Sequence, residues 1–326
     1  MKKTVVKTAT YALCALGSTA LTLPAFSQAA NPAPMVKAGI ITDIHHTSKA
    51  DSATRKYSAS LDKLQVFVGT MARERPAFVI EMGDFVDTLA EGTDPAKNLA
   101  EAEELFTSFD GPHYHVLGNH EFDNLTREMF LAAIDNTGIP KGQTYYSWDA
   151  GGVHFIVLDA DYTPEPPHRP YDMNTAKDTF WTWKDTFVPA QEMEWLREDL
   201  KKADMPTVVF THQTLDRLDE QDHTIKNASA VRQVLEEDGQ VLAVISGHDH
   251  QGGYANLKGI HYIVLHGNVG VHDDRAWAAT SKTEGFDVHQ DNQFAVLEIG
   301  KGEGKEYLIN LRGFGRQPSY TLKREL

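Results

Sequence analysis

Short apolar runs of strand length, spaced along most of the chain, limit most strongly what this sequence can fold into. They lie at residues 36–42, 77–82, 114–117, 153–158, 207–211, 241–246 and 261–265. Several of these runs lack a strict alternation of apolar and polar residues, which is typical of strands that are covered on both faces. We therefore expect sheets whose strands are buried between other layers of the fold.

Helical patterns fill intervals between these runs. Apolar residues fall on one helical stripe at Tyr57, Leu61, Leu64, Val68 and Met71, and the segments 191–203 and 228–238 have a similar pattern. Strands that alternate with helices predict an α/β fold. Near the C-terminus, the more regularly alternating runs 293–299 and 306–311 are joined by a glycine-rich stretch, which predicts a β-hairpin.

Residues 1–30 are expected to lie outside a single folded domain that spans 31–326. Lys2, Lys3 and Lys7 precede an apolar stretch at 10–26, and small residues follow it, as in a secretory signal peptide. A retained membrane anchor is the alternative, but residues 17–19 and Pro24 interrupt the stretch. We expect cleavage, a periplasmic or secreted protein, and no membrane span in the remainder.

Cysteine content and charge exclude several kinds of site. The only cysteine is Cys14, inside the expected signal, so the folded domain can have neither a disulfide framework nor a cysteine metal site. A metal would have to be held by His, Asp, Glu or Asn. The formal net charge of −15 makes a nucleic-acid polymer an unsuitable partner, and an anionic substrate would need a local source of positive charge.

Polar residues that can bind metal follow several of the strand-like runs. They are Asp43, His45 and His46; Asp84 and Asp87; Asn119, His120 and Glu121; His212; and His248, Asp249 and His250. The carboxyl ends of strands in an open α/β sheet face the ligand crevice, so these groups can meet there. Each group alone is explained as well by turn chemistry or a hydrogen-bonded histidine. Together, carboxylate, amide and imidazole groups suit Mn, Fe or Zn better than Ca.

The ordered set resembles the calcineurin-like metallophosphoesterases. The matching blocks are "DIH" at 43–45, "GDFVD" at 83–87, "GNHE" at 118–121, His212, and "GHDH" at 247–250. The resemblance covers roughly residues 36–270. It implies a four-layer α/β/β/α sandwich of two mixed sheets flanked by helices, and a dimetal-dependent phosphoric ester hydrolase.

The resemblance also implies a role for each residue. Asp43, His45 and His250 would bind one metal ion, Asn119, His212 and His248 would bind a second, and Asp84 would bridge them. A hydroxide shared by the two metals would attack phosphorus. His120 would stay off the metals and act as the acid for the leaving group, and His46 would not be a ligand. Asp87, Glu121, Asp123 and Asp249 would orient ligand imidazoles by accepting their second N–H groups.

Longer stretches point to one branch of that family. The segments 55–61, 114–122, 145–162 and 247–254 look most similar to manganese-dependent ADP-ribose/CDP-alcohol diphosphatases and related secreted phosphatases. The expected substrate is therefore a small phosphomonoester, phosphodiester or nucleotide diphosphate. A catalytically silent metal-binding scaffold and a phosphoprotein phosphatase are the alternatives. The oligomeric state is left open.

A long irregular stretch at 161–189 is rich in aromatic residues, including Phe180, Trp181, Trp183 and Phe187. Loops of this length in a compact domain are usually functional or disordered, and large aromatic side chains argue against disorder. The loop is expected either to pack as a lid on the core or to form an aromatic wall of the substrate cleft. Trp181, Trp183 and Arg55 are the candidate substrate contacts.

Overall fold

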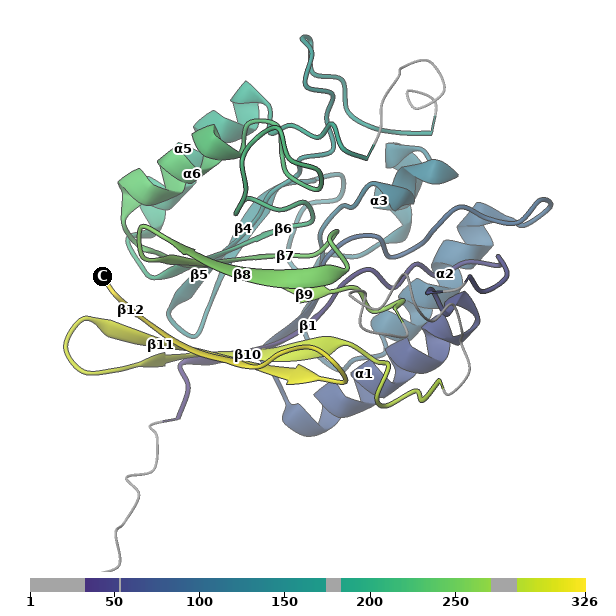
Figure 1. Ribbon diagram of the computed structural model, residues 1–326, viewed down its shortest axis with the longest axis horizontal. Coiled ribbons are helices and arrows are strands. Elements are labelled where there is room, and N and C mark those ends of the chain that lie inside the picture. The colour runs from purple at the N-terminus through teal and green to yellow at the C-terminus, as the bar shows by residue number, and fades with distance from the viewer. Residues whose placement is uncertain (1–32, 53, 174–182, 271–285) are drawn as a thin grey trace, which may run out of the picture. The chain divides into compact units, whose positions relative to one another are not determined.

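Two six-stranded sheets pack against each other and carry helices on their outer faces (Figure 1). The computed structural model describes residues 33–52, 54–173, 183–270 and 286–326, and residues 33–326 form one compact unit. The predicted four-layer α/β/β/α sandwich of two mixed sheets is confirmed. Among the described residues, no helix is long and apolar enough to span a membrane.

The first sheet has the strand order β12-β11-β10-β1-β2-β3. Its strands are β1 (Val36–Ile41), β2 (Phe78–Glu81), β3 (His113–His115), β10 (Phe294–Lys301), β11 (Glu306–Phe314) and β12 (Tyr320–Glu325). Strands β1, β2 and β3 are parallel, whereas β10 pairs antiparallel with β1 and β11, and β11 with β12. The predicted C-terminal hairpin is confirmed as β10 and β11.

The second sheet has the strand order β4-β5-β6-β7-β9-β8. Its strands are β4 (Tyr146–Ala150), β5 (Val153–Val157), β6 (Thr207–Thr211), β7 (Val241–Ser246), β8 (Gln251–Leu257) and β9 (Ile260–His266). The central strands β5, β6, β7 and β9 are parallel, and the edge strands β4 and β8 are antiparallel to their neighbours. The parallel strands are the buried apolar runs that the sequence predicted.

Helices cover the outer face of each sheet. The predicted helical segments are α1 (Ser60–Glu74), which follows a 3₁₀ turn at Tyr57–Ala59, and α5 (Ala190–Ala203) and α6 (Ala228–Asp238). Sequence patterns missed α2 (Pro95–Phe106) and the short α3 (Arg127–Ala133). A signal for α2 was present, because Asp94 caps its first turn by accepting a hydrogen bond from the Ala96 N–H and proline follows the cap.

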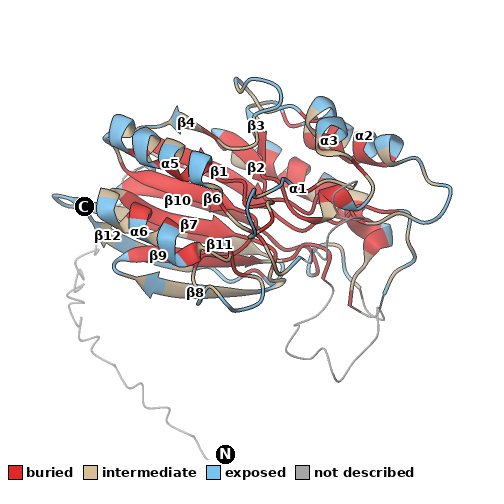
Figure 2. Ribbon diagram, turned by 90° about the horizontal axis from the view of Figure 1, so that it is seen from above, coloured by how far each residue is buried: buried red, intermediate tan, exposed pale blue. Residues whose placement is uncertain are grey.

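Apolar side chains fill the spaces between the layers. Ile40 and Ile80 of the first sheet meet Phe155 and Phe210 of the second in the central core. A second cluster lies under α1 and α2, and a third lies under α5 and α6. Figure 2 shows the consequence: the central strands are buried, while α5 and α6 expose only their outer surfaces. This packing fixes the strand ends from which the functional loops leave.

Candidate metal centre

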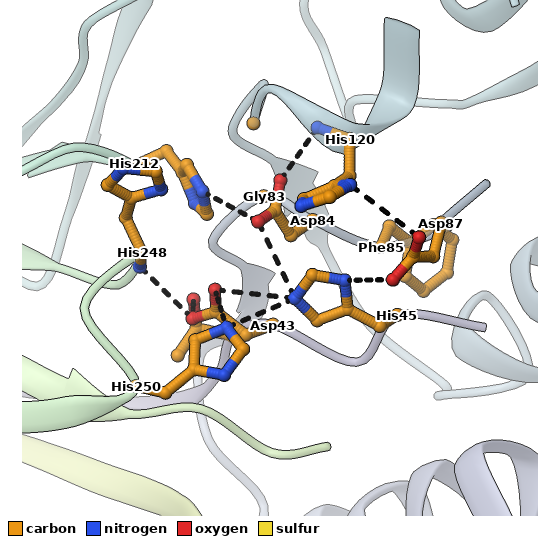
Figure 3. Close-up of polar contacts among 12 residues, drawn as sticks. Asp43, His45, Gly83, Asp84, Phe85, Asp87, His120, His212, His248 and His250 are labelled. Atoms are coloured by element: carbon orange, nitrogen blue, oxygen red, sulfur yellow. Dashed lines mark hydrogen bonds and ion pairs between the residues drawn. The ribbon is translucent and has the colours of Figure 1, made fainter. Parts of the chain in front are cut away.

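The loops after β1, β2, β3, β6 and β7 bring the predicted site residues together (Figure 3). Tight backbone turns are needed to do so. Asp43, His45, Asp84 and His248 have φ values of 54°, 51°, 55° and 66°, in the left-handed region that side chains other than glycine seldom adopt. Such conformations cluster at functional sites, where the surrounding structure holds them in place.

Gly118 is required by the close approach of two of these loops. A Cβ atom added at Gly118 would lie 2.3 Å from the Asp84 backbone nitrogen and 2.5 Å from its Oδ1 atom. The loop after β3 therefore touches the loop after β2 through bare backbone. This contact carries Asn119 and His120 to the side of Asp84, whose Oδ1 accepts a hydrogen bond of 2.9 Å from the His120 N–H.

The first group of converging side chains comprises Asp43, His45, Asp84 and His250, and one potential ligand atom from each lies within 4.8 Å of all the others. The Nε2 atoms of His45 and His250 are 3.1 Å apart. Asp43 Oδ1 lies 3.1 Å from His250 Nε2, and Asp84 Oδ2 lies 3.5 Å from His45 Nε2. These atoms surround a common point in the way that the ligands of one cation do.

The second group comprises Asp84, His212 and His248, whose potential ligand atoms also lie within 4.8 Å of one another. His212 Nε2 is 3.2 Å from Asp84 Oδ2, the same oxygen that faces His45 in the first group. Asn119 is buried and lines one pocket together with Asp84 and His248. Asp84 therefore belongs to both groups. The family resemblance implied a bridging carboxylate at this residue.

Unpaired polar atoms show that the site fits metal ions. Asp43 Oδ1, Asn119 Oδ1, His212 Nε2 and His248 Nε2 are buried and have no hydrogen-bond partner among the described residues. A buried polar atom without a partner is costly, so such atoms need an explanation such as an ion. These four atoms belong to predicted ligands, and their oxygen and imidazole chemistry suits Mn, Fe or Zn.

Hydrogen bonds at the outer ring nitrogens orient two of the imidazoles. His45 Nδ1 donates to Asp87 Oδ2 over 2.9 Å, and His212 Nδ1 donates to the Met82 carbonyl over 2.8 Å. In the neutral ring each of these bonds leaves Nε2 with a free lone pair directed into the site. Asp87 thus accepts the outer N–H group of His45, one of the predicted ligands.

Glu121 and Asp249 have partners other than the expected ligand imidazoles. The Glu121 carboxylate accepts hydrogen bonds from the backbone N–H groups of Gly118, Asp84 and Phe85. It therefore fixes the loop after β2 rather than a histidine ring. Asp249 Oδ2 accepts a 2.5 Å hydrogen bond from Arg217. Asp84 and Phe85 are far from Glu121 in the sequence, and Arg217 lies in an irregular loop, so no spacing pattern pointed to these partners.

The Asp123 carboxylate holds the His120 ring apart from the two groups. Its Nδ1 atom donates to Asp123 Oδ2 over 2.7 Å, and the side chain lines the pocket. His45, Asp87 and His120 also form a possible metal-holding trio. The Nδ1 atoms of both histidines already have carboxylate partners, however, and these bonds account for that grouping.

Local charge sets the protonation of the imidazoles. Burial lowers the pKa of His45 to about 4, and burial together with the charge of His212 lowers the pKa of His248 well below its usual value. Both rings are therefore neutral near pH 7, as metal ligands must be. Burial would also lower the pKa of His120, but the charges of Asp84 and Asp123 raise it to about 9, so this ring carries a proton.

The pKa values of Asp84 and His212 are shifted in opposite directions by each other's charge. Burial would raise the pKa of Asp84, but the charges of His212 and His120 lower it well below its usual value. Burial would lower the pKa of His212, yet the Asp84 carboxylate raises it well above its usual value. A cation at this point would displace the proton from His212, so metal binding is expected to release protons.

The two groups open into a pocket of about 180 Å³ that is also lined by Arg55, Trp183 and His223. Arg55 Nη1 lies 3.6 Å from Asp87 Oδ2, and the Trp183 side chain is 36% exposed. The predicted contact Trp181 lies outside the described residues. His223 was missed from the sequence, because it follows no strand and belongs to no spacing pattern. Its ring lies 5.1 Å from that of His248 and 4.6 Å from that of Trp183.

A two-sheet α/β/β/α sandwich with this cluster at its strand ends defines a metallophosphoesterase. The chain belongs to the calcineurin-like phosphoesterase family, whose profile matches residues 36–252. The family is one of phosphoric ester hydrolases, in agreement with the class of enzyme that the sequence predicted.

Individual relatives agree with this placement. The chain is 26% identical over 267 residues to a manganese-dependent ADP-ribose/CDP-alcohol diphosphatase of Arabidopsis thaliana, a match that covers 70% of this chain and 85% of the relative. It is 26% identical over 285 residues to a diphosphatase of the same name from Danio rerio, with 72% and 88% covered. The crystal structure of a Danio rerio dimetal phosphatase has the same fold, with a TM-score of 0.67, 21% identity, and 90% and 100% covered.

Proposed function

We propose that this protein hydrolyses small nucleotide diphosphates of the ADP-ribose and CDP-alcohol type with the help of two divalent cations, Mn²⁺ being the first candidate. The observation that carries the proposal is the pair of ligand groups that share Asp84 Oδ2 and contain unpaired buried atoms. The names of the relatives support the choice of metal and of substrate class.

The chain's own residues would hold both cations. Asp43, His45 and His250 would bind one, Asn119, His212 and His248 the other, and Asp84 both. When bound, two such ions lower the pKa of a water molecule and neutralise negative charge on phosphate oxygens. They also give a protein of net charge −15 a local site that attracts an anion. The same donor atoms suit Fe and Zn, so the identity of the metal is decided by experiment.

His120 would serve as the proton donor to the leaving group. Asp123 holds its Nδ1 atom over 2.7 Å, so the ring can present Nε2–H to a substrate in the pocket. In the metal-free protein the charges of Asp84 and Asp123 raise the pKa of this ring to about 9, and Asp123 would still favour the protonated ring that a general acid needs when cations are bound. Proton transfer from His120 to the oxygen that leaves phosphorus would complete the cleavage.

The other walls of the pocket would select the substrate. The Arg55 guanidinium can pair with a phosphate oxygen, and the exposed face of Trp183 can pack against a flat base. A nucleotide diphosphate offers both a base and a second phosphate group. We propose accordingly that these two side chains favour diphosphates over simple monoesters.

A substrate panel tests the proposed function. The purified protein, freed of metal and then supplied with Mn²⁺, is expected to cleave ADP-ribose and a CDP-alcohol faster than p-nitrophenyl phosphate or its diester. Metal analysis on the same sample gives the stoichiometry. A protein that binds two metal ions and cleaves none of these compounds would support a silent scaffold instead. The panel also contains a phosphopeptide, and faster cleavage of that peptide than of the nucleotides would support a protein phosphatase.

We also propose that residues 1–30 direct export and are then removed, which would place the enzyme in the periplasm or outside the cell. The charged start and the apolar stretch at 10–26 support this. Intact-mass measurement of protein recovered from a periplasmic fraction would show a shortened N-terminus. Recovery of the full-length chain from the cytoplasm alone would contradict export.

A further inference from the structure

A buried lysine beneath the metal centre has no place in the chemistry described so far. Lys63 lies on α1, and its side chain is completely buried. Burial disfavours the ammonium ion and lowers the pKa of Lys63 to about 7, although the charge of Asp291 acts in the opposite direction. A lysine in such surroundings needs hydrogen-bond acceptors to remain charged.

Among the described residues, both acceptors of Lys63 belong to the segment that follows β9. Its Nζ atom donates to the Asn268 carbonyl and, over 3.1 Å, to the Gly270 carbonyl. The Asn292 side chain donates a hydrogen bond to the Lys63 backbone carbonyl over 2.9 Å. It also accepts one from the side-chain amide of Asn268 over 2.7 Å. Lys63 and Asn292 therefore hold this segment from the side of α1.

The same segment, residues 267–270, touches the metal centre at two points. The Asn268 and Val269 N–H groups donate to the carbonyls of Thr42 and Asp43, over 3.0 Å and 2.9 Å. A Cβ atom added at Gly267 would lie 2.6 Å from the His250 ring, so the backbone packs directly against that imidazole. Asp43 and His250, two predicted ligands of one cation, are thus both in contact with this segment.

A third contact links residues 267–270 to the substrate pocket. Gly270 forms an antiparallel β-bridge with Arg55, and the Lys56 N–H donates to the Val269 carbonyl over 3.0 Å. The Arg55 side chain lines the pocket beside His120. One short backbone segment therefore sets the position of Asp43, His250 and Arg55 together.

We propose that Lys63 is a positioning residue that, through residues 267–270, holds Asp43 and His250 for the metal and Arg55 for the substrate phosphate. The roles of these three residues rest on the proposed function. Lys63 itself touches neither metal nor substrate. Its amino group donates to two carbonyls whose neighbours form the site, so its loss would loosen metal binding and substrate binding at once.

The variant Lys63→Met tests this, because methionine has a similar length and volume but no donor. We expect its affinity for Mn²⁺ alone, measured by calorimetry, to fall about tenfold or more, as it does when groups supporting metal ligands are lost. We also expect KM for ADP-ribose to rise. The matched control is Lys97→Met, because Lys97 is 76% exposed and, in the part of the chain that the structure describes, its ion pair is with Glu101. It should leave both quantities unchanged.

A double-variant comparison separates positioning from a general loss of stability. In an Arg55→Met background, Lys63→Met should raise KM much less than it does alone, because the side chain that it positions is already gone. The proposal would be overturned if folded Lys63→Met had an unchanged Mn²⁺ affinity and KM. It would also be overturned if the change in KM of the double variant equalled the product of the changes in the two single variants.

Lys63→Gln, which keeps an N–H donor, provides a second comparison if Lys63→Met does not fold. We expect it to fold with an intermediate loss of Mn²⁺ affinity. Failure of both variants to fold would contradict the proposal, because Lys63 would then act in overall stability. If the natural protein hydrolyses no substrate, the proposed function fails, but the comparison of Mn²⁺ affinities still tests the role of Lys63.

Discussion

At the scale of single residues, the proposed function assigns metal binding and proton transfer to different side chains. Asp84 Oδ2 faces both ligand groups, whereas His120 is tied to Asp123 and presents its other nitrogen to the pocket. Neighbouring carboxylates and imidazoles that look interchangeable in the sequence therefore have different surroundings. Substitutions at these positions are expected to have different consequences.

Asp84→Ala and His120→Ala distinguish the two roles. We expect Asp84→Ala to lose both Mn²⁺ binding and turnover, because it removes the oxygen that both groups share. His120→Ala should keep Mn²⁺ binding but lower kcat about 10²–10⁴-fold, the usual contribution of a general acid. Mn²⁺ titration and steady-state kinetics measure the two effects. Equal loss of Mn²⁺ in both variants would refute the division of roles.

His115 lies outside the site, and no sequence motif sets it apart from other strand residues. Its Nδ1 atom is 3.4 Å from the carboxylate of Glu81 on β2, and its Nε2 atom is 3.1 Å from that of Glu103 on α2. Burial would lower the pKa of His115, but the charges of Glu103 and Glu81 raise it to about 10. The ring is therefore charged in the folded protein at neutral pH.

This buried pairing predicts a pH-dependent stability. The pKa of His115 is higher in the folded than in the unfolded protein. Its contribution to the free energy of unfolding is therefore complete below about pH 6.5 and is lost as the pH rises through about 10. His115→Asn should lower the free energy of unfolding at pH 6 by roughly 3–5 kcal/mol, as when a buried ion pair is broken. Urea unfolding at pH 6 and pH 10.5 should show a smaller difference at the higher pH. A difference that does not change with pH would contradict this assignment.

At the scale of elements, the contact between the loops after β2 and β3 is a tight constraint on the centre. Gly118→Ala would place a methyl group 2.3 Å from the Asp84 nitrogen, so one of the two loops must move. We expect Mn²⁺ affinity to fall about 10–100-fold, as it does for other changes that displace supporting groups. The control is Gly69→Ala on α1, where an added Cβ meets only the end of Arg73, 4.0 Å away. An unaltered affinity in Gly118→Ala would show that this contact is not needed.

Strands buried on both faces were predictable from the sequence, whereas the edge strands β4, β8 and β12 were not. The apolar runs that became β1, β5, β6, β7 and β9 are almost entirely buried, so their composition alone identified them. The edge strands β8 and β12 are largely exposed and carry mixed polar residues, which leaves no apolar run to find. The edge strand β4 was also missed.

The candidate ligands were predictable for a related reason. Each follows a parallel strand, so its place at one edge of a sheet is fixed once the strand is recognised. His223, Glu121 and Asp249 depend instead on irregular loops or on partners in other loops. Such contacts are set by the packing of distant segments, and a single sequence contains no spacing that reveals them.

At the scale of the whole molecule, the two sheets meet so that each contributes part of the centre. Asp43, Asp84 and Asn119 follow strands of the first sheet, whereas His212 and His248 follow strands of the second. The core between the sheets therefore sets the distance between the ligand groups. Because a dimetal centre would bind the folded protein but not the unfolded chain, Mn²⁺ should stabilise the entire fold.

Removal of metal tests this coupling. The protein treated with a chelator should unfold at a lower temperature than the protein saturated with Mn²⁺, and the difference should grow with free Mn²⁺ concentration. A stabilisation of about 2.7 kcal/mol is expected when the free ion reaches a hundred times its dissociation constant. Thermal unfolding across a Mn²⁺ series gives the result, and Asp84→Ala should not respond. An identical response in that variant would place the bound metal elsewhere.

The most direct test of the shared centre is an equilibrium Mn²⁺ titration of the metal-free protein, with bound metal counted per chain. The structure predicts two ions per chain in the natural protein, because two ligand groups share Asp84. It predicts loss of both in Asp84→Ala. Binding of a single ion to the natural protein, or retention of two in Asp84→Ala, would contradict the account.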